Sequence, residues 1–437
     1  MTYLTIKNER AQLMRYDTAV ILKRFFFCER SLLISEAGWI AGTAPLLLKI
    51  KYAKMMWEDA QAADAMRTRV FELRYPSRLM SKEGEEPLIQ FLDEARNAPN
   101  ALAFYLSLAE LFKPAMANAY REYLDLADGI GDGPSIRFMH QALRDKERQI
   151  KELEGFLDEM LSADPDGEVT ARAWVNGLQS HLDALGGIGL DKVEAPSPSR
   201  ELQLDGRSEF LVAQVPARES SYPRLRFYWP DICVPDYPYG EGLTLQVRSA
   251  VSHINEVWAI EACSAFTYAF SSLLPWEFLV DATRWTYDES RHCQMGYERL
   301  MQWGYRKEEI PLGTYIYDAA KDEDPIYRLG MLYFFETKNI NKKPKRRDKF
   351  IEYNDALSQH DMDFDWADET IHAHYGNLWL QEVQKARGDE PDPKSVRTRC
   401  HELIDNIITS ATDAEREEIL ALADAMMEKA AAIAQQV

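Results

Sequence analysis

Two short segments of the sequence carry the same pattern of chemically active side chains. Residues 288–292 read D-E-S-R-H, and residues 368–372 read D-E-T-I-H, 80 positions later. In a helix, residues three apart lie on one face, so the Glu and His of each copy can direct a carboxylate oxygen and an imidazole nitrogen at one point. Each copy is therefore a candidate chelating pair for a metal ion: Glu289 with His292, and Glu369 with His372.

Each chelating pair also has a glutamate at the same distance upstream. Glu256 lies 33 residues before Glu289, and Glu336 lies 33 residues before Glu369. A helical hairpin with ~16 residues in each arm returns the chain to the same level on the neighbouring helix. Four-helix bundles that bind two metal ions place a single Glu on two helices and Glu-x-x-His on the other two. The sequence thus predicts a dinuclear metal site with six ligands: Glu256, Glu289, His292, Glu336, Glu369 and His372.

Glu261 is an alternative to Glu256 as the first ligand. The five positions between them rotate a helix by ~140°, so the two carboxylates cannot face one metal at the same depth. The spacing of 33 residues favours Glu256.

Residues from about 252 to 376 resemble the ferritin-like superfamily of di-iron carboxylate proteins. The run E-V-W-A-I-E from Glu256 to Glu261 is similar to the first iron-binding helix of bacterioferritins, where the leading Glu is the ligand. The D-E-x-R-H pattern resembles the oxygen-activating branch, which includes bacterial multicomponent monooxygenases and acyl desaturases. The resemblance implies that Asp288 and Asp368 hydrogen-bond the metal-bound imidazoles and fix their tautomers. It departs at Ile340, where some monooxygenases have a Thr.

The resemblance also implies how the ligands divide between two irons. Glu256, Glu289 and His292 would hold one iron, and the other three ligands would hold the second, with two glutamates bridging. Mixed carboxylate and imidazole ligation with open positions suits Fe(II) or Mn(II) better than zinc. We therefore expect two iron ions, with manganese as the alternative metal.

The expected function is an O₂-dependent non-heme di-iron oxidoreductase, a monooxygenase or oxidase acting on a small organic substrate. Two ferrous ions can together supply two electrons to O₂, and a reductase or other electron donor would restore them. We expect no catalytic residues beyond the metal ligands. The alternative is an iron-handling ferroxidase or peroxide-detoxifying protein without an organic substrate, and a third hypothesis is an interaction protein that the metal stabilises.

The apolar periodicity predicts a mainly α fold, with a ferritin-like four-helix bundle, an added helical N-terminal region and a short β-containing connector. The expected domains are 1–194 (helical), 195–250 (connector), 251–387 (bundle) and 394–437 (C-terminal helices). In the N-terminal region, turn residues should end six or seven helices at four breaks: 75–76, 128–134, 164–167 and 186–189.

The finer predictions concern the bundle and its approach. Residues 201–204, 210–215, 225–229 and 243–247 are short β-rich runs, so this segment is either a small sheet with strands there or an extended connector, and its prolines and glycines favour the connector. After it we expect a continuous helix from Ser252 to Leu274. The acidic stretch 361–365 is predicted to be irregular, and the basic run 342–347 to be a solvated hairpin tip.

The composition limits the class of protein. The chain has 437 residues, 51 Lys+Arg against 71 Asp+Glu, and 46% hydrophobic residues, which indicates an acidic globular protein. Five scattered cysteines without C-x-x-C favour reduced core residues over disulfides or thiolate zinc. Because there is no basic surplus, no leader-like segment and no long apolar run, we expect a cytoplasmic protein without nucleic-acid or membrane partners. A homodimer is compatible with these features.

Overall fold

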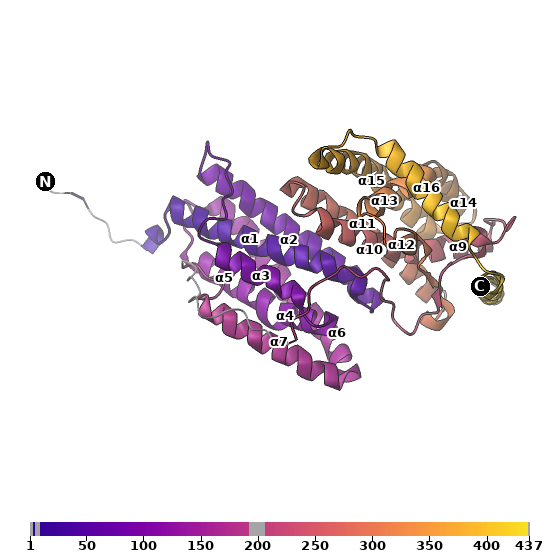
Figure 1. The fold of residues 1–437 in the computed structure, drawn as a ribbon, viewed down its shortest axis with the longest axis horizontal. Helices are drawn as coiled ribbons and strands as arrows, with labels where there is room; N and C mark the ends of the chain where they lie inside the picture. The colour runs from indigo at the N-terminus through magenta and orange to yellow at the C-terminus, as the bar shows by residue number, and fades with distance from the viewer. Residues whose placement is uncertain (1–2, 5–8, 192–205, 436–437) are drawn as a thin grey trace. The chain divides into compact units, whose positions relative to one another are not determined.

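The structure is a computed structural model that describes residues 3–4, 9–191 and 206–435 (Figure 1). These segments are mainly helical, as the sequence predicts. The first part contains η1 (Glu9–Ala11), α1 (Arg15–Trp39), η2 (Ile40–Gly42), α2 (Leu46–Leu73), α3 (Glu86–Glu94), η3 (Ala95–Asn97), α4 (Ala101–Ser107), η4 (Leu108–Phe112), α5 (Lys113–Leu126), α6 (Gly133–Ala163) and α7 (Pro165–Ala184). The second part contains β1 (Arg224–Leu225), α8 (Pro230–Cys233), α9 (Leu243–Ile254), α10 (Val257–Phe270), α11 (Trp276–Gln302), η5 (Lys307–Glu309), β2 (Leu312–Gly313), α12 (Tyr315–Ala319), α13 (Ile326–Asn339), η6 (Ile340–Lys342), α14 (Lys343–Glu352), α15 (Ala356–Arg387), α16 (Pro393–Thr409) and α17 (Asp413–Ala434).

The chain forms two compact units. Unit 1 comprises residues 1–36 and 55–211, and unit 2 comprises residues 37–54 and 212–437. The division falls within α1 and α2, so each of these helices contributes residues to both units. The predicted domain boundaries at residues 194, 250 and 387 stay predictions.

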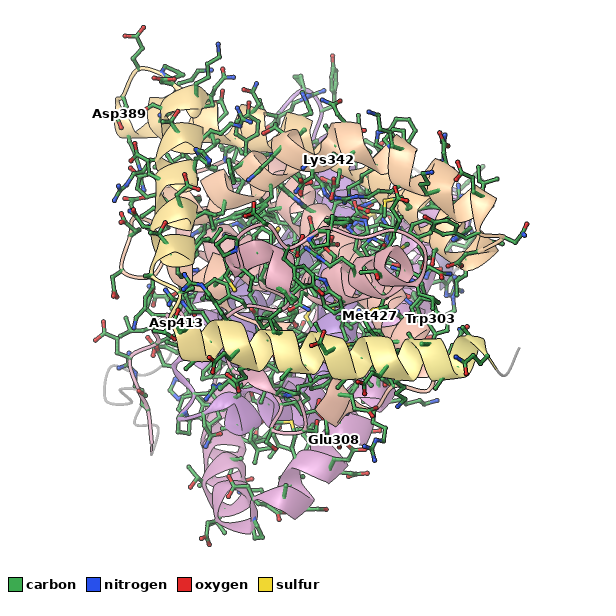
Figure 2. All side chains as sticks on the ribbon, turned by 90° about the vertical axis from the view of Figure 1, so that its right-hand side faces the viewer. Trp303, Glu308, Lys342, Asp389, Asp413 and Met427 are labelled. Carbon is green, nitrogen blue, oxygen red and sulfur yellow. The ribbon has the colours of Figure 1, made fainter. Side chains whose placement is uncertain are left out.

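Four helices of unit 2 pack around one another in a closed cycle. Helix α10 contacts α11 and α13, and α15 contacts the same two helices. Further helices cover this group, because α9 packs on α11, α14 packs on α15 and α16 packs on α13. Helix α17 packs on α8 and α9; Figure 2 shows it with Asp413 and Met427 labelled, and Trp303 beside it. The residues predicted to do chemistry all lie on or beside the four central helices.

The predicted continuous helix from Ser252 to Leu274 is wrong, because the chain breaks between α9 and α10. The Asn255 amide nitrogen donates to the carbonyls of Val251, 2.8 Å away, and Pro311, 2.9 Å away, and its oxygen accepts from the Gly313 N–H at 2.7 Å. A side chain that bonds to backbone groups of another segment favours a helix end. The break places Glu256 immediately before the first residue of α10.

Three other local predictions are also corrected. Residues 243–247 form the start of α9 rather than a strand, and residues 361–365 lie inside α15 rather than in an irregular stretch. The described strands are the two-residue segments β1 and β2, which pair in parallel. Residues 210–215 form no strand, and the predicted strand at 201–204 lies outside the described residues.

The turn and cap signals of the sequence were more informative. Helices end before or begin after each of the four breaks predicted in the N-terminal region, and seven α-helices lie in the described part of that region. Helix α15 begins where the Asp355 carboxylate accepts from the Ser358 N–H, 3.0 Å away, and ends at Gly388, which adopts φ 86°. Such N-caps and left-handed glycines are the ordinary boundaries of helices.

Two further properties follow from burial and helix composition. All five cysteines are buried and free, as the sequence predicts: Cys28, Cys233, Cys263, Cys293 and Cys400. Among the described helices, none combines the length and apolar character needed to cross a membrane.

Gly296 allows α11 to lie against the α9 backbone. A Cβ atom at this position would lie 2.2 Å from the Ile254 N and 2.5 Å from the Ala250 carbonyl oxygen. Both neighbours are backbone atoms, which cannot move aside as a flexible side chain can. This close approach fixes the level of the α9–α10 break against α11, and therefore the level of Glu256 against His292.

We expect Gly296→Ala to destabilise unit 2 by about 1–3 kcal/mol, because the added methyl group forces the two backbones apart. Thermal unfolding measured by circular dichroism tests this. The matched control is Gly155→Ala in α6, where the site is open and alanine should stabilise the helix by about 0.5–1 kcal/mol. Equal unfolding temperatures for the two variants would contradict the packing argument.

Candidate metal centre

The central helices of unit 2 bring most of the predicted ligands together. His292 Nδ1 lies 3.1 Å from Glu256 Oε2 and 3.6 Å from Glu289 Oε2. His372 Nδ1 lies 3.3 Å from Glu289 Oε1 and 3.6 Å from Glu336 Oε1. The side chains form two groups whose donor atoms lie within 4.8 Å of one another, and Glu289 is a member of both. A carboxylate shared in this way can bridge two metal ions.

Each histidine of the two groups is oriented by an aspartate from the opposite helix. His292 Nε2 lies 3.2 Å from Asp368, which is on α15, and His372 Nε2 lies 3.3 Å from Asp288, which is on α11. Because a carboxylate accepts hydrogen bonds, each Nε2 carries the proton and donates it, and each Nδ1 faces the group of carboxylates. The resemblance implied this Asp–His partnership, and the structure adds that the partners are exchanged between α11 and α15.

Two arginines hold these aspartates in place. Arg291 donates to Asp288 and, at 2.6 Å, to Asp368, so one guanidinium joins the two aspartates. Arg284 donates to Asp288 at 2.8 Å. Burial would raise the pKa of Asp288, but His372 and the two arginines lower it well below its usual range. Arg291 is the fourth residue of the D-E-S-R-H pattern, so its closeness to the ligands could have been predicted from the sequence.

The carboxylates of the two groups differ in their proton affinity. Burial raises the pKa of both Glu256 and Glu336 to about 7, which means that these outer carboxylates retain protons near neutral pH. Burial acts in the same direction on Glu289, but His292 and His372 outweigh it and lower its pKa to about 2. The shared carboxylate is therefore the one that stays ionised.

Four buried atoms at this centre have no hydrogen-bond partner among the described residues. They are Glu256 Oε2, His292 Nδ1, Glu369 Oε2 and His372 Nδ1, and all four belong to predicted ligands. His292 Nδ1 and Glu256 Oε2 lie 3.1 Å apart but are not aligned as a hydrogen bond. Buried polar atoms are almost always hydrogen-bonded, and an unpaired one indicates a missing water or ion. The donor set of carboxylate oxygens and imidazole nitrogens fits Fe(II) or Mn(II).

Glu369 lies in neither of these two groups and instead contacts a buried lysine. The Lys343 ammonium forms ion pairs with both Glu369 and Asp365, one turn earlier on α15. Residues 343–347 lie in helix α14 and Lys343 is 4% exposed, so the prediction of a solvated hairpin tip at 342–347 is wrong, although Lys342 itself is exposed. In this arrangement the ammonium supplies a positive charge to the carboxylates on α15.

Sequence reasoning missed Asp365, which lies 3.6 Å from His292 Nδ1. Its position four residues before Glu369 placed it on the ligand face of a helix, and that signal was hidden by the assumption of an irregular stretch.

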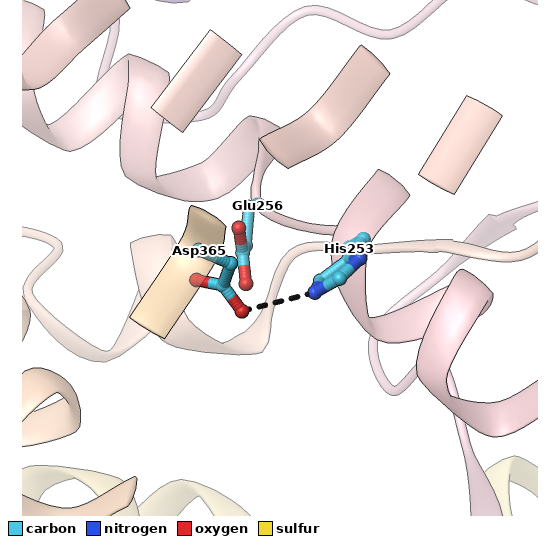
Figure 3. A group of neighbouring side chains, drawn as sticks. All are labelled: His253, Glu256 and Asp365. Carbon is cyan, nitrogen blue, oxygen red and sulfur yellow. Dashed lines mark hydrogen bonds and ion pairs between the residues drawn. The ribbon is translucent and has the colours of Figure 1, made fainter. Parts of the chain in front are cut away.

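His253, Glu256 and Asp365 form a third group of potential ligands (Figure 3). His253 Nε2 lies 3.1 Å from Asp365 Oδ2, and its Nδ1 faces the Arg299 guanidinium. Because arginine only donates, His253 Nδ1 accepts and Nε2 carries the proton. Burial and Arg299 lower the pKa of His253 to about 3. The imidazole therefore positions Asp365 and has no free nitrogen for a metal.

Two more residues clarify the boundary of the centre. The Glu261 carboxylate pairs with Lys49 and Arg218 and belongs to none of the three groups, whereas Glu256 belongs to two. Trp285 donates its indole N–H to Glu289 Oε1 at 2.9 Å and stacks on His372. Trp285 thus holds both the shared carboxylate and one imidazole.

Comparison with known proteins finds a similarity to one family, whose activity is not described. Residues 238–416 match the family described as "Protein of unknown function (DUF455)", and this span contains all six predicted ligands. No curated protein and no solved structure matches the chain.

The pKa shifts predict how metal-free protein responds to pH. Burial raises the folded-state pKa of Glu256 and Glu336 to about 7. The protonated groups therefore contribute to the stability of the folded protein at acidic pH, and this contribution is lost as the pH rises through about 7. Burial opposes charge on His292 and His372, but the surrounding carboxylates raise both pKa values, so their contribution is also lost as the pH rises through the folded-state pKa. A bound cation would replace these protons.

We therefore expect Mn(II) to raise the unfolding temperature by several degrees more at pH 8 than at pH 6. Differential scanning calorimetry with and without Mn(II) measures the shift. A shift that is equal at both pH values, or larger at pH 6, would contradict proton replacement at these four side chains.

The exchanged aspartates give a second prediction. Asp288→Asn and Asp368→Asn should each weaken metal binding by roughly 10–100-fold, because the imidazole loses the carboxylate that fixes its tautomer and raises its basicity. Isothermal titration with Mn(II) measures the affinity. Asp363→Asn is the control, since Asp363 lies on α15 with an exposed side chain; a loss as large in this variant would mean that charge alone matters.

Proposed function

We propose that unit 2 is a ferritin-like bundle that binds two metal ions, iron in the first place, and acts as an O₂-dependent oxidoreductase on a small organic substrate. The observation that carries the proposal is the set of four buried ligand atoms without hydrogen bonds, two imidazole nitrogens and two carboxylate oxygens. Their distribution over both Glu-x-x-His pairs supports two metal positions rather than one.

The protein donors leave room for other ligands. Each of the two groups contains three residues, two glutamates and one histidine, with Glu289 in common. Fe(II) sites with three protein ligands of this kind keep open positions for exogenous ligands. When bound, a pair of ferrous ions supplies two electrons to O₂.

The residues around the ligands have separate tasks in this proposal. Asp288 and Asp368 hold the imidazole protons at Nε2, which leaves Nδ1 free to bind. Trp285 fixes one oxygen of the shared carboxylate. Burial of the imidazoles and of Glu289 excludes water, so charges in the site act on bound molecules more strongly than in solvent.

A surface cavity of about 310 Å³ supports the proposal, because it could bind a small-molecule substrate or serve as its access route. Its lining includes Arg291, which also binds Asp288 and Asp368. The remaining lining residues lie on α11 and α15: Gln294, Met295, Glu298, Leu357, His360 and Asp361. The cavity is therefore separated from the two imidazoles by one layer of hydrogen-bonded side chains.

The test is metal uptake under anaerobic conditions followed by exposure to O₂. Wild-type protein should bind about two equivalents of Fe(II) per chain, because the ligands make one dinuclear set, and should react optically with O₂. Glu289→Ala should lose both, since the shared carboxylate is removed. Glu277 on the same helix is exposed and lies outside the cavity lining, so Glu277→Ala should retain both.

An excess of Fe(II) separates an enzyme from an iron-handling protein. Uptake that stops at about two equivalents supports the oxidoreductase, and continued oxidation with accumulation of a mineral supports iron handling. Binding of one zinc ion without Fe(II) uptake would overturn the proposal of a dinuclear iron centre.

A further inference from the structure

Unit 1 contains a second buried cluster of charged side chains at the meeting point of four helices. The helices are α1, α2, α5 and α6, and the charged residues are Glu29, Glu36, Asp59, Lys113 and Lys146. Each is at most 3% exposed. Buried lysines and carboxylates at this density are rare in proteins unless each charge has a partner.

Asp59 lies at the centre of this cluster and bridges the two ammonium groups. Its Oδ1 lies 2.8 Å from the Lys146 Nζ, and its Oδ2 lies 2.9 Å from the Lys113 Nζ. Lys146 also contacts Glu29 at 2.8 Å, and Lys113 contacts Glu36 at 3.1 Å. Each ammonium therefore lies between a carboxylate from α1 and the shared carboxylate from α2.

Gln149 completes the cluster from α6. Its side-chain oxygen accepts from the Lys113 Nζ at 2.9 Å, and its nitrogen donates to Asp59 Oδ1 at 2.9 Å. Gln149 lies three residues after Lys146, so both side chains leave α6 on the same face.

The spacing of these residues matches the metal centre of unit 2. Lys113 and Lys146 are 33 positions apart, and Gln149 follows three positions later. The same spacing relates three predicted ligands on α13 and α15: Glu336, Glu369 and His372. On the other two helices, Glu29 precedes Asp59 by 30 positions, close to the 33 between Glu256 and Glu289.

The contacts correspond as well as the spacing. In unit 2, Glu289 on the second helix belongs to both ligand groups. In unit 1, Asp59 on the second helix contacts both ammonium groups. Each cluster thus has one carboxylate in a shared position, between two ligand groups in unit 2 and between two ammonium groups in unit 1, and in each the fourth helix contributes two side chains three residues apart.

We propose that unit 1 is a second copy of the helix arrangement of unit 2, in which the ammonium groups of Lys113 and Lys146 take the places of two metal ions. This inference rests on the proposed metal centre for its comparison, but its geometry is independent of it. It implies that unit 1 folds without metal and that the chain has one dinuclear centre rather than two.

The charges of the cluster suit a lysine-filled site. Burial would raise the pKa of Asp59, but the two lysines lower it to about 2, so the shared carboxylate is ionised, like Glu289. Burial raises the pKa of Glu29 to about 7, as it does for Glu256. An ammonium is tethered to its helix, so this positive charge cannot dissociate as an ion can.

The competing interpretation is that the cluster is an ordinary buried ion-pair network. Substituting metal ligands into unit 1 distinguishes this interpretation from the proposed copy. The rebuilt chain carries Lys113→Glu, Lys146→Glu, Gln149→His and Ala62→His, the last because Ala62 lies three residues after Asp59 as His292 does after Glu289. Glu289→Ala is added to remove metal binding by unit 2.

The rebuilt full-length chain should bind about two equivalents of Fe(II) under anaerobic conditions, whereas Glu289→Ala alone should bind none. Metal content is measured after gel filtration, and folding by circular dichroism. A rebuilt chain that folds and takes up no Fe(II) overturns the inference. Because the signal comes from unit 1, it is read separately from wild-type uptake, whose absence would instead count against the proposed function.

A milder variant covers the case in which the fourfold change does not fold. Lys113→Glu with Gln149→His, in the Glu289→Ala background, should unfold at a higher temperature when Fe(II) is added. Lys113→Met with Gln149→His is the control and should gain no such shift, because methionine adds no carboxylate. An equal response of the two variants, or a carboxylate variant that stays unfolded with Fe(II), overturns the inference.

Discussion

A carboxylate taken out of water needs a positive charge beside it, and this requirement organises the interior of both units. Several kcal/mol are lost when such a group is buried alone. In unit 1 the chain supplies the charge itself, through Lys113 and Lys146. In unit 2, Lys343 serves in this way for Asp365 and Glu369 on α15, whereas Glu256 Oε2, Glu369 Oε2 and the Nδ1 atoms of both imidazoles make no hydrogen bond. With metal ions bound in unit 2 as proposed, the two units would differ in where their cations come from.

The position of the unit 2 centre depends on contacts far from it in the sequence. Asn255 ends α9 by binding the backbone at Pro311 and Gly313, and Gly296 lets α11 approach that break. The exchange of Asp288 and Asp368 between α11 and α15 then fixes the rotation of both helices, because each imidazole must meet its partner across the bundle. The positions of the predicted ligands are thus set by hydrogen bonds of residues that are not predicted ligands themselves: Asn255, Asp288 and Asp368.

The sequence predicted the features that depend on local chemistry or on periodic spacing. Helix ends followed from turn residues and caps such as Asp355 and Gly388, and the repeat of 33 residues predicted which side chains would meet. The break at Asn255 was not predictable, since its cause is a backbone segment more than fifty residues away.

The burial of Lys343 was not predictable from the basic run for a similar reason. A run of Lys and Arg normally remains in solvent, and only the arrangement of α14 against α15 turns one member of this run inward. The cluster of unit 1 escaped notice because lysine and glutamine are not metal ligands. A repeat of Glu and His residues is not visible in a segment where Lys113, Lys146 and Gln149 have the matching spacing.

Arg291 connects the surface of unit 2 to both imidazoles. The same guanidinium lines the 310 Å³ cavity and donates to Asp288 and Asp368. An anion bound in the cavity would draw Arg291 hydrogen bonds away from the aspartates, which would then accept more strongly from His292 and His372. Both imidazoles would then become stronger electron donors at the same time. Binding of an anion in the outer cavity would thus change the ligand strength of His292 and His372 together.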